Sequence, residues 1–152
     1  MKRQTEAVII GGGVIGCSIA YHLAKLGMTD VMLLERQELT SGSSWHAAGG
    51  VHGLHDTNNI ARLQYYTMNL YRELEQETRQ SVGFHQTGYL YLAQTEDRAH
   101  QLRSSAAKAR QFSGVEFHEI SLEEAAKRHP FVHLDGIRMA VWESESGHVD
   151  VH

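Results

Sequence analysis

Residues 41–50 read Ser-Gly-Ser-Ser-Trp-His-Ala-Ala-Gly-Gly, a run of small residues that holds one nucleophilic side chain, His46. A neutral imidazole nitrogen can attack an electrophilic carbon near pH 7. Small residues allow the backbone to approach another group closely, because little or no side chain lies in between. The segment therefore predicts a backbone that approaches a bound group closely, with His46 as a candidate nucleophile beside it.

A glycine fingerprint precedes this segment, because residues 11–16 read Gly-Gly-Gly-Val-Ile-Gly and fit the pattern G-x-G-x-x-G. Gly11 allows the tight turn after a strand, Gly13 allows the backbone to approach a pyrophosphate, and Gly16 allows the helix to pack on the sheet. The N-terminus of the helix then offers N–H groups and a positive dipole end to phosphate oxygens.

Glu35 follows the fingerprint at about the 20-residue spacing that dinucleotide sites show. An acid at this position accepts hydrogen bonds from ribose hydroxyls and disfavours a 2′-phosphate. Fingerprint and acid together predict a bound adenine dinucleotide but do not separate NAD from FAD. The second Gly- and Ser-rich loop, residues 41–50, favours a flavin that lies extended across the domain.

The elements that must position these residues form a strand–helix–strand unit. Residues 7–10 and 31–34 are short apolar runs typical of buried parallel strands, and residues 14–26 predict a helix between them. Gly27 is placed to end that helix. A crossover of this kind is right-handed. The residues expected on one face of the helix are Ile15, Ile19, His22, Leu23 and Leu26.

The regular alternation stops after residue 36. Residues 37–57 predict a loop with one short helical turn. The pattern then predicts helices at about 59–78, 95–112 and 121–129, and strands at 88–93, 115–118 and 136–142. Thr95 and Ser121 are expected N-caps, and Pro130 stops the last helix. Ile60, Leu63, Thr67, Leu70 and Leu74 are the predicted buried stripe of the 59–78 helix.

The chain resembles the flavin domain of the dimethylglycine and sarcosine dehydrogenases, within the D-amino-acid-oxidase-like flavoenzymes. The resemblance implies an α/β fold: a Rossmann-like FAD-binding βαβ unit plus the start of a mixed, largely antiparallel substrate-domain sheet, in an incomplete domain. The segments that carry it are 8–16, 33–36, 39–49, 70–75, 82–88 and 147–150.

We expect the whole chain, residues 1–152, to be the N-terminal part of a longer FAD-dependent oxidoreductase domain. Residues 1–57 would bind FAD, residues 58–142 would contribute to the substrate side, and residues 143–152 would return towards the FAD domain. Two parallel strands are too few for a doubly wound sheet, which is the reason to expect more chain.

The resemblance also implies which residues touch the flavin. In that family the histidine of Trp-His-Ala-Ala-Gly is bonded covalently to the flavin 8α-methyl group, and this histidine is His46 here. Trp45 could stack beside the flavin or fill the core, and we favour the core. The other expected FAD-binding residues are Gly11, Gly13, Val14, Ile15, Gly16, Glu35, Arg36, Ser43, Ser44 and, more weakly, Gly50.

The implied reaction is oxidative N-demethylation, in which a hydride passes from an N-methyl amino acid to the flavin. The electron acceptor would be an electron-transfer flavoprotein or oxygen, and tetrahydrofolate would bind in a C-terminal domain outside this chain. Catalytic residues are expected downstream. Three alternatives stay open: a non-catalytic regulatory relative, in which we expect the flavin-linking histidine to be replaced; an inactive truncated fragment; and an enzyme whose substrate is another small amine or amino acid.

Composition excludes several other functions. The net charge of −4 is mild and the basic residues are scattered, so nucleic acid is not an expected partner. Cys17 is the only cysteine, so no internal disulfide forms.

We expect no membrane span and a cytoplasmic location, or the mitochondrial matrix for a processed eukaryotic protein. His52, His55 and Asp56 lack the further ligands of a metal site, so no metal is expected.

Overall fold

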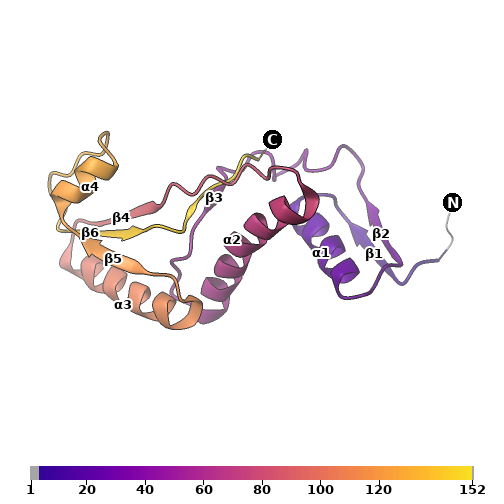
Figure 1. Ribbon diagram of the computed structural model, residues 1–152, viewed down its shortest axis with the longest axis horizontal. Coiled ribbons are helices and arrows are strands. Elements are labelled where there is room, and N and C mark those ends of the chain that lie inside the picture. Colours follow the sequence, from indigo (N-terminus) through magenta and orange to yellow (C-terminus); the bar gives the residue numbers. More distant parts are fainter. Residues whose placement is uncertain (1–3, 152) are drawn as a thin grey trace. The chain divides into compact units, whose positions relative to one another are not determined.

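The computed structural model describes residues 4–151, which divide into two compact units. The first unit holds residues up to Ala48 together with Val151, and the second holds Gly49–Asp150. Four helices and seven strands are present in the described residues (Figure 1), which confirms the predicted α/β class. Each unit is described below by itself.

The first unit is the predicted strand–helix–strand crossover. It consists of β1 (Ala7–Ile10), α1 (Val14–Lys25) and β2 (Val31–Leu34). The two strands are parallel, with Ala7 opposite Val31 and Ile10 opposite Leu34, and α1 packs on both. Gly27 follows the helix with φ near +95°, a conformation that suits glycine. The βαβ prediction is therefore confirmed.

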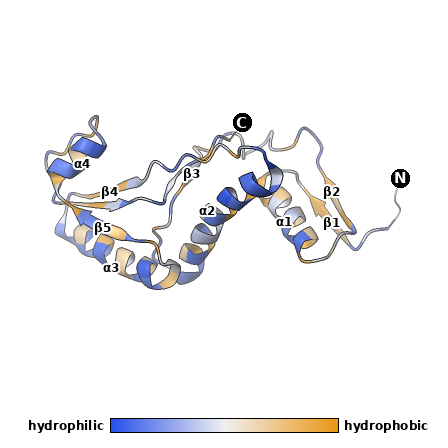
Figure 2. Ribbon diagram, in the orientation of Figure 1, coloured by the Kyte–Doolittle hydropathy of each residue, from blue (hydrophilic) through white to orange (hydrophobic). Residues whose placement is uncertain are grey.

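One face of this small sheet is uncovered, which the sequence pattern did not indicate. Val8 and Ile10 are 52% and 87% exposed, although the strand reads as buried on both faces. On α1, Ile15 and Leu26, two of the residues expected on one face of the helix, are 73% and 84% exposed. Successive side chains of a strand point to opposite faces, and α1 covers only one of them in this unit. The apolar strands are orange in Figure 2.

The second unit contains an antiparallel sheet in the order β4-β6-β5, with Tyr89 and Phe117 both opposite Glu143. A separate two-stranded ribbon joins β3 to β7. The elements are β3 (Gly50–Val51), α2 (Asn58–Thr78), β4 (Tyr89–Ala93), α3 (Glu96–Ser113), β5 (Phe117–Ile120), α4 (Leu122–Arg128), β6 (Met139–Glu143) and β7 (Gly147–His148).

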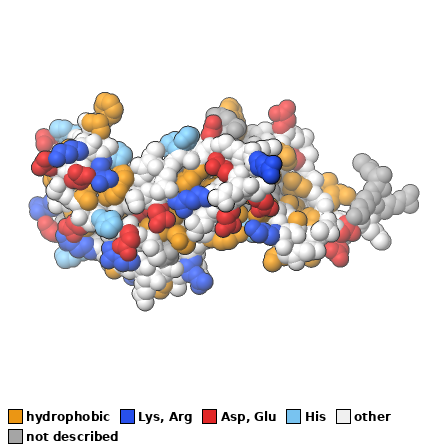
Figure 3. Space-filling model, viewed as in Figure 1, with side chains coloured by type: hydrophobic (Ala, Val, Ile, Leu, Met, Phe, Trp, Pro, Cys, Tyr) orange, Lys and Arg blue, Asp and Glu red, His pale blue; other side chains and the backbone are white. Residues whose placement is uncertain are grey.

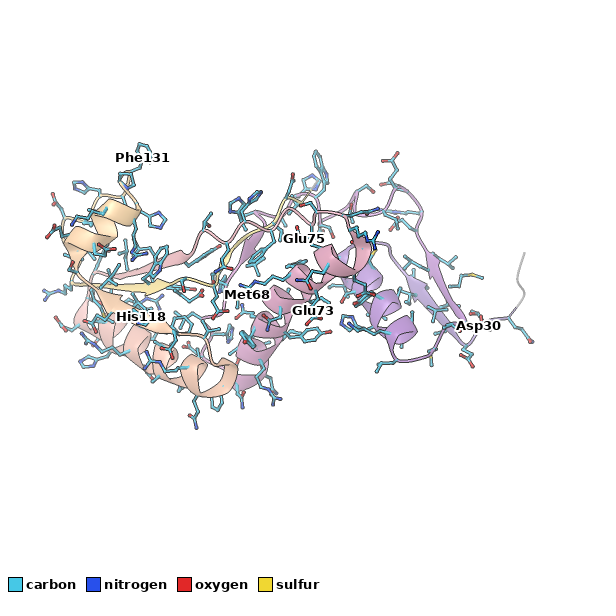
Figure 4. All side chains as sticks on the ribbon, in the orientation of Figure 1. Asp30, Met68, Glu73, Glu75, His118 and Phe131 are labelled. Atoms are coloured by element: carbon cyan, nitrogen blue, oxygen red, sulfur yellow. The ribbon has the colours of Figure 1, made fainter. Side chains whose placement is uncertain are left out.

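The core of this unit lies between the sheet and the helices α2 and α3. Its buried residues are Met68, Ala93, Ala99, Leu102, Ala106, Ala109, Val115, Phe117, Met139 and Val141. Met68, labelled on α2 in Figure 4, and Ala61 are both fully buried, whereas Ile60 and Leu63 are 40% and 58% exposed. The predicted α2 stripe is therefore wrong in its first half, because the residues that face the core there are Ala61 and, seven positions on, Met68.

The first residues of the helices were predicted more accurately than the first residues of the strands. The Thr95 hydroxyl accepts a hydrogen bond from the N–H of Arg98 (3.2 Å), and the Ser121 hydroxyl accepts one from Glu124 (3.1 Å). Both predicted N-caps are confirmed. By contrast, β5 and β6 begin two and three residues later than predicted, and β3 and β7 were not predicted at all.

Charge is mixed over the surface of the second unit. On the face shown in Figure 3, basic and acidic side chains alternate over α3 and α4, with ion pairs such as Arg103–Glu119 (3.0 Å) and Lys127–Glu123 (2.8 Å). Among residues 4–151, none of the helices combines the length and the apolar character that crossing a lipid bilayer requires.

Candidate functional site

The glycine turn between β1 and α1 is held to the end of β2. Gly11 has a φ of +106°, a region that disfavours other residues, and its N–H donates to the carbonyl of Leu34 (2.8 Å). At Gly16, a Cβ atom would overlap the backbone oxygen of Gly11. Both glycines are therefore required by geometry for the helix to start where it does.

Glu35 lies directly after β2 and binds this turn. Its Oε2 accepts the N–H of Gly12 (2.7 Å), and its Oε1 accepts the N–H of Gln37 (2.9 Å). These hydrogen bonds, the one from Gly12 foremost, lower the pKa of the Glu35 carboxyl below its ordinary value. The ionised carboxylate is exposed, and each oxygen keeps a lone pair that could accept a hydrogen bond from a ligand hydroxyl.

Ser44 brings the loop of residues 41–50 to the N-terminus of α1. The N-cap of α1 is Gly13, which has no side chain, and the hydroxyl of Ser44 accepts the N–H of Val14 (2.9 Å) in its place. The N–H groups of Ile15 and Gly16 precede the first intrahelical bond, from Cys17 to Gly13, and so have no acceptor within α1. An anion could accept hydrogen bonds at this helix end.

His46 is exposed, and its ring nitrogens have different roles. Nδ1 lies 2.9 Å from the carbonyl oxygen of Gly42, which can only accept a hydrogen bond, so Nδ1 carries the hydrogen. Nε2 of the neutral ring therefore has a free lone pair and is the nucleophilic atom. The ring of Trp45 lies edge-on to the His46 ring, with 5.1 Å between the two ring centroids. Because Trp45 is 45% exposed, our preference for a core position of this residue is wrong in this structure.

The structure brings together most of the other predicted residues, but not all. Arg36 is exposed next to Glu35, and Ser43 is exposed within the loop. Gly50 lies in the second unit, where it pairs with His148 in the β3–β7 ribbon, and a Cβ on Gly50 would overlap the Tyr89 hydroxyl. The structure therefore gives Gly50 a packing role within the second unit.

The three residues considered for a metal are engaged separately. His55 Nδ1 accepts the N–H of Thr57 (3.1 Å) just before α2, and Asp56 is hydrogen-bonded to Ser105. The His52 ring is tilted against Tyr89, and burial lowers its pKa, so it is a neutral imidazole near pH 7. Within residues 4–151, no three His, Cys, Asp or Glu side chains are grouped as a metal site would need.

Two residues of this site were missed by sequence reasoning. Gly12 is buried, and a Cβ there would lie 3.0 Å from the Glu35 Cβ. Its carbonyl accepts the N–H of Thr40 (2.9 Å), and Thr40 has a left-handed φ of +64°. The run of three glycines could have indicated Gly12, because a variable position of the fingerprint seldom needs glycine, but nothing in the sequence indicates Thr40.

Comparison with known proteins gives consistent matches over the whole chain. The family model "FAD dependent oxidoreductase" (DAO) matches residues 6–152. Mitochondrial dimethylglycine dehydrogenase of Rattus norvegicus is 42% identical over 98% of this chain, and mitochondrial sarcosine dehydrogenase of Homo sapiens is 36% identical over 99%. The chain spans only 17% and 16% of their lengths. The crystal structure of L-proline dehydrogenase from P. horikoshii superposes with a TM-score of 0.89 and 28% identity, over 99% of this chain and 39% of that one.

Substituting Gly16 tests the glycine turn. In the full-length protein, Gly16→Ala places a methyl group against the Gly11 carbonyl, so the turn must open, and we expect the FAD content of the purified protein to fall by about tenfold or more. Gly42→Ala is the matched control, because its Cβ would meet nothing within 4 Å, and it should keep the wild-type FAD content. Equal FAD content in both variants would contradict the role given to Gly16.

The lowered pKa of Glu35 sets the pH range in which this carboxylate stabilises the fold. A group whose pKa is lower in the folded state stabilises the fold above its unfolded pKa, and this contribution is lost as the pH falls through the folded pKa. We expect the full-length protein to unfold at a higher temperature than its Glu35→Gln variant at pH 7 and pH 5, with the difference shrinking once the pH falls below the ordinary glutamate pKa of about 4.3 and vanishing only below the lowered pKa of Glu35. Thermal unfolding at several pH values measures this. Glu38→Gln, at an exposed acid of the same segment, is the control; a Glu35→Gln difference that grows on acidification would refute the assignment.

Proposed function

The chain belongs to the DAO family of FAD-dependent oxidoreductases, and from this membership we propose that it is the FAD-binding part of an enzyme that oxidises small N-methyl amino acids. The observation that carries the proposal is the convergence of the glycine turn, Glu35 and the Ser44–His46 segment in one unit. This arrangement supports a diphosphate site and a nucleophilic imidazole on one short stretch of chain.

The first unit fits the adenosine and pyrophosphate end of FAD. The helix end at Ile15 and Gly16 supplies N–H donors for phosphate oxygens, and the glycines leave room for them. Glu35 accepts hydrogen bonds from the ribose hydroxyls, and its negative charge repels a 2′-phosphate. Gly11, Gly13, Val14, Arg36 and Ser43 are the remaining proposed contacts. The Ser44 hydroxyl holds the loop in place for the flavin end of the molecule.

We assign the covalent attachment of FAD to His46. Its Nε2 lone pair is free because Nδ1 donates to the Gly42 carbonyl. The new bond would join Nε2 to the 8α carbon in place of one C–H bond of that methyl group. Two protons, one from the methyl group and one from Nδ1, would leave with two electrons, and an external acceptor would have to take up these electrons. Trp45 is proposed to pack beside the attached group. Attachment keeps the cofactor in place and makes it a stronger oxidant.

The substrate class and the electron acceptor follow from the relatives. Dimethylglycine and sarcosine dehydrogenases act, by their names, on N-methylated glycines, and 42% and 36% identity to them supports this substrate class here. Bound FAD would accept the hydride from the N-methyl group, and the protein would position the amine. An electron-transfer flavoprotein or oxygen would then take the electrons. Tetrahydrofolate would accept the one-carbon unit in a further domain.

We further propose that residues 1–57 form the FAD side, that residues 58–142 belong to the substrate side, and that residues 143–152 return to the FAD side. The acid, base and carboxylate-binding groups of catalysis are expected elsewhere in the full-length protein. Two of the relatives named above carry "mitochondrial" in their names, which supports the mitochondrial matrix for a eukaryotic protein and the cytoplasm for a bacterial one.

Acid precipitation tests the bond to His46. The full-length protein should keep yellow fluorescence on the precipitated polypeptide, because a covalent bond survives unfolding, and His46→Ala should release the flavin to the supernatant. His133→Ala is the control, since this exposed histidine pairs with Asp135 in the second unit (3.1 Å). Complete release from the wild-type protein would disprove covalent attachment.

Substrate-dependent bleaching of the flavin tests the activity. Anaerobic mixing of the full-length protein with dimethylglycine or sarcosine should abolish the oxidised-flavin absorbance within seconds, whereas glycine, which has no N-methyl group, should leave it unchanged over the same time. An artificial electron acceptor should restore the absorbance. A protein that binds FAD but shows no bleaching with any N-methyl amino acid would contradict this substrate class. Bleaching by another small amine or amino acid would then indicate a different substrate, and no bleaching by any of them a non-catalytic relative.

A further inference from the structure

The most unusual ionisable group in the described residues is Glu143, the last residue of β6. Its side chain is fully buried, and it lies between Tyr89 of β4 and Phe117 of β5 across the sheet. An ionised carboxylate is strongly disfavoured in such a position unless it is paired with a cation. A buried acid at the end of a core strand therefore needs a structural explanation.

Glu143, Ser146 and Gly53 are linked by a short series of hydrogen bonds, which we call the relay. Oε1 of Glu143 accepts the backbone N–H groups of Glu145 (2.6 Å) and Ser146 (2.9 Å) and so closes the turn that follows β6. Ser146 is also fully buried, and its hydroxyl oxygen accepts the N–H of Gly53 (3.1 Å). The relay thus joins the end of β6 to the segment that follows β3, more than 90 residues earlier in the chain.

The surroundings of Glu143 act on its carboxyl in both directions. Burial is the largest cause that raises its pKa, and the charge of Glu145 raises the pKa further, whereas hydrogen bonds from the backbone N–H groups of Glu145, Ser146 and Gly53 lower it. Tyr89 and Tyr91 face Glu143 from β4. Arg72 of α2 pairs with Glu145 (3.7 Å). Among the described residues Oε2 of Glu143 has no hydrogen-bond partner, and the two N–H groups that close the turn both donate to Oε1.

The segment that this relay holds, residues 50–54, is also packed closely against the residues around it. A Cβ on Gly53 would lie 3.3 Å from Met68 Cε and 3.5 Å from Val115 Cγ2, so the backbone there is pressed against the core. At the start of the segment, Gly50 lies against the Tyr89 hydroxyl. The Ser146 hydroxyl gives the buried N–H of Gly53 the partner that a buried donor requires.

We propose that Glu143 is a positioning residue: through Ser146 it holds residues 50–54 in place, and so fixes the point at which the chain leaves the predicted flavin loop. The part that concerns the flavin loop rests on the function proposed above, whereas the relay itself does not. Glutamine at position 143 keeps a side-chain oxygen that can accept these N–H groups, whereas leucine has none.

Hydrogen exchange followed by mass spectrometry tests this in the full-length protein. In Ser146→Ala, Gly53 loses its acceptor, and in Glu143→Leu the turn at residues 145–146 is released. We expect peptides covering residues 50–57 to exchange about five to ten times faster in both variants. Glu143→Gln should exchange like the wild type. Glu119→Leu is the matched control, because it makes the same replacement at a half-exposed position of the neighbouring strand β5.

Two results would overturn the proposal: unchanged exchange at residues 50–57 in Ser146→Ala, or Glu143→Gln exchanging as fast as Glu143→Leu. If Glu143→Leu does not fold, Ser146→Ala and Glu143→Gln still decide the question. Flavin content is measured on the same samples. A wild-type protein without flavin would refute the proposed function and leave the relay standing, whereas a normal flavin content with unchanged exchange would refute only the relay.

Discussion

The contact between α1 and the glycine turn is the constraint on which the first unit depends. Because the helix starts with Gly16 against the carbonyl of Gly11, its N-terminus lies directly over the end of β1. Gly12 can then donate to Glu35 at the end of β2, and Ser44 can cap the helix that Gly13 leaves uncapped. Three segments distant in sequence therefore meet at one helix end, and any side chain at Gly16 would separate them.

The structure could be predicted from the sequence wherever neighbouring residues alone determine it. The crossover, the caps at Thr95 and Ser121 and the fingerprint glycines follow from turn geometry and helix ends, and all appear as expected. The burial of individual side chains could not be predicted where it depends on residues distant in the chain. Val8 and Ile10 read as core residues yet are exposed, and Ala61 rather than Ile60 faces the core.

The candidate site, too, could be predicted only in part from the sequence. Glu35 was identifiable from its spacing, but its two hydrogen bonds to backbone N–H groups were not, because they depend on how the turn at Gly12 meets the end of β2. The tautomer of His46 depends on a carbonyl four residues away, within a loop that has no periodic pattern. The relay from Glu143 to Gly53 joins the turn after β6 to the segment after β3, a two-residue strand that is too short for any pattern to reveal.

The uncovered face of β1 and β2 has a consequence for the stability of the first unit. Val8, Ile10 and Leu34 expose apolar surface there, and each Å² of such surface removed from water is worth about 25 cal/mol. Parallel strands are normally covered on both faces, whereas α1 covers only one face here. Any element that packs on the open face is therefore expected to stabilise the crossover that carries the glycine turn.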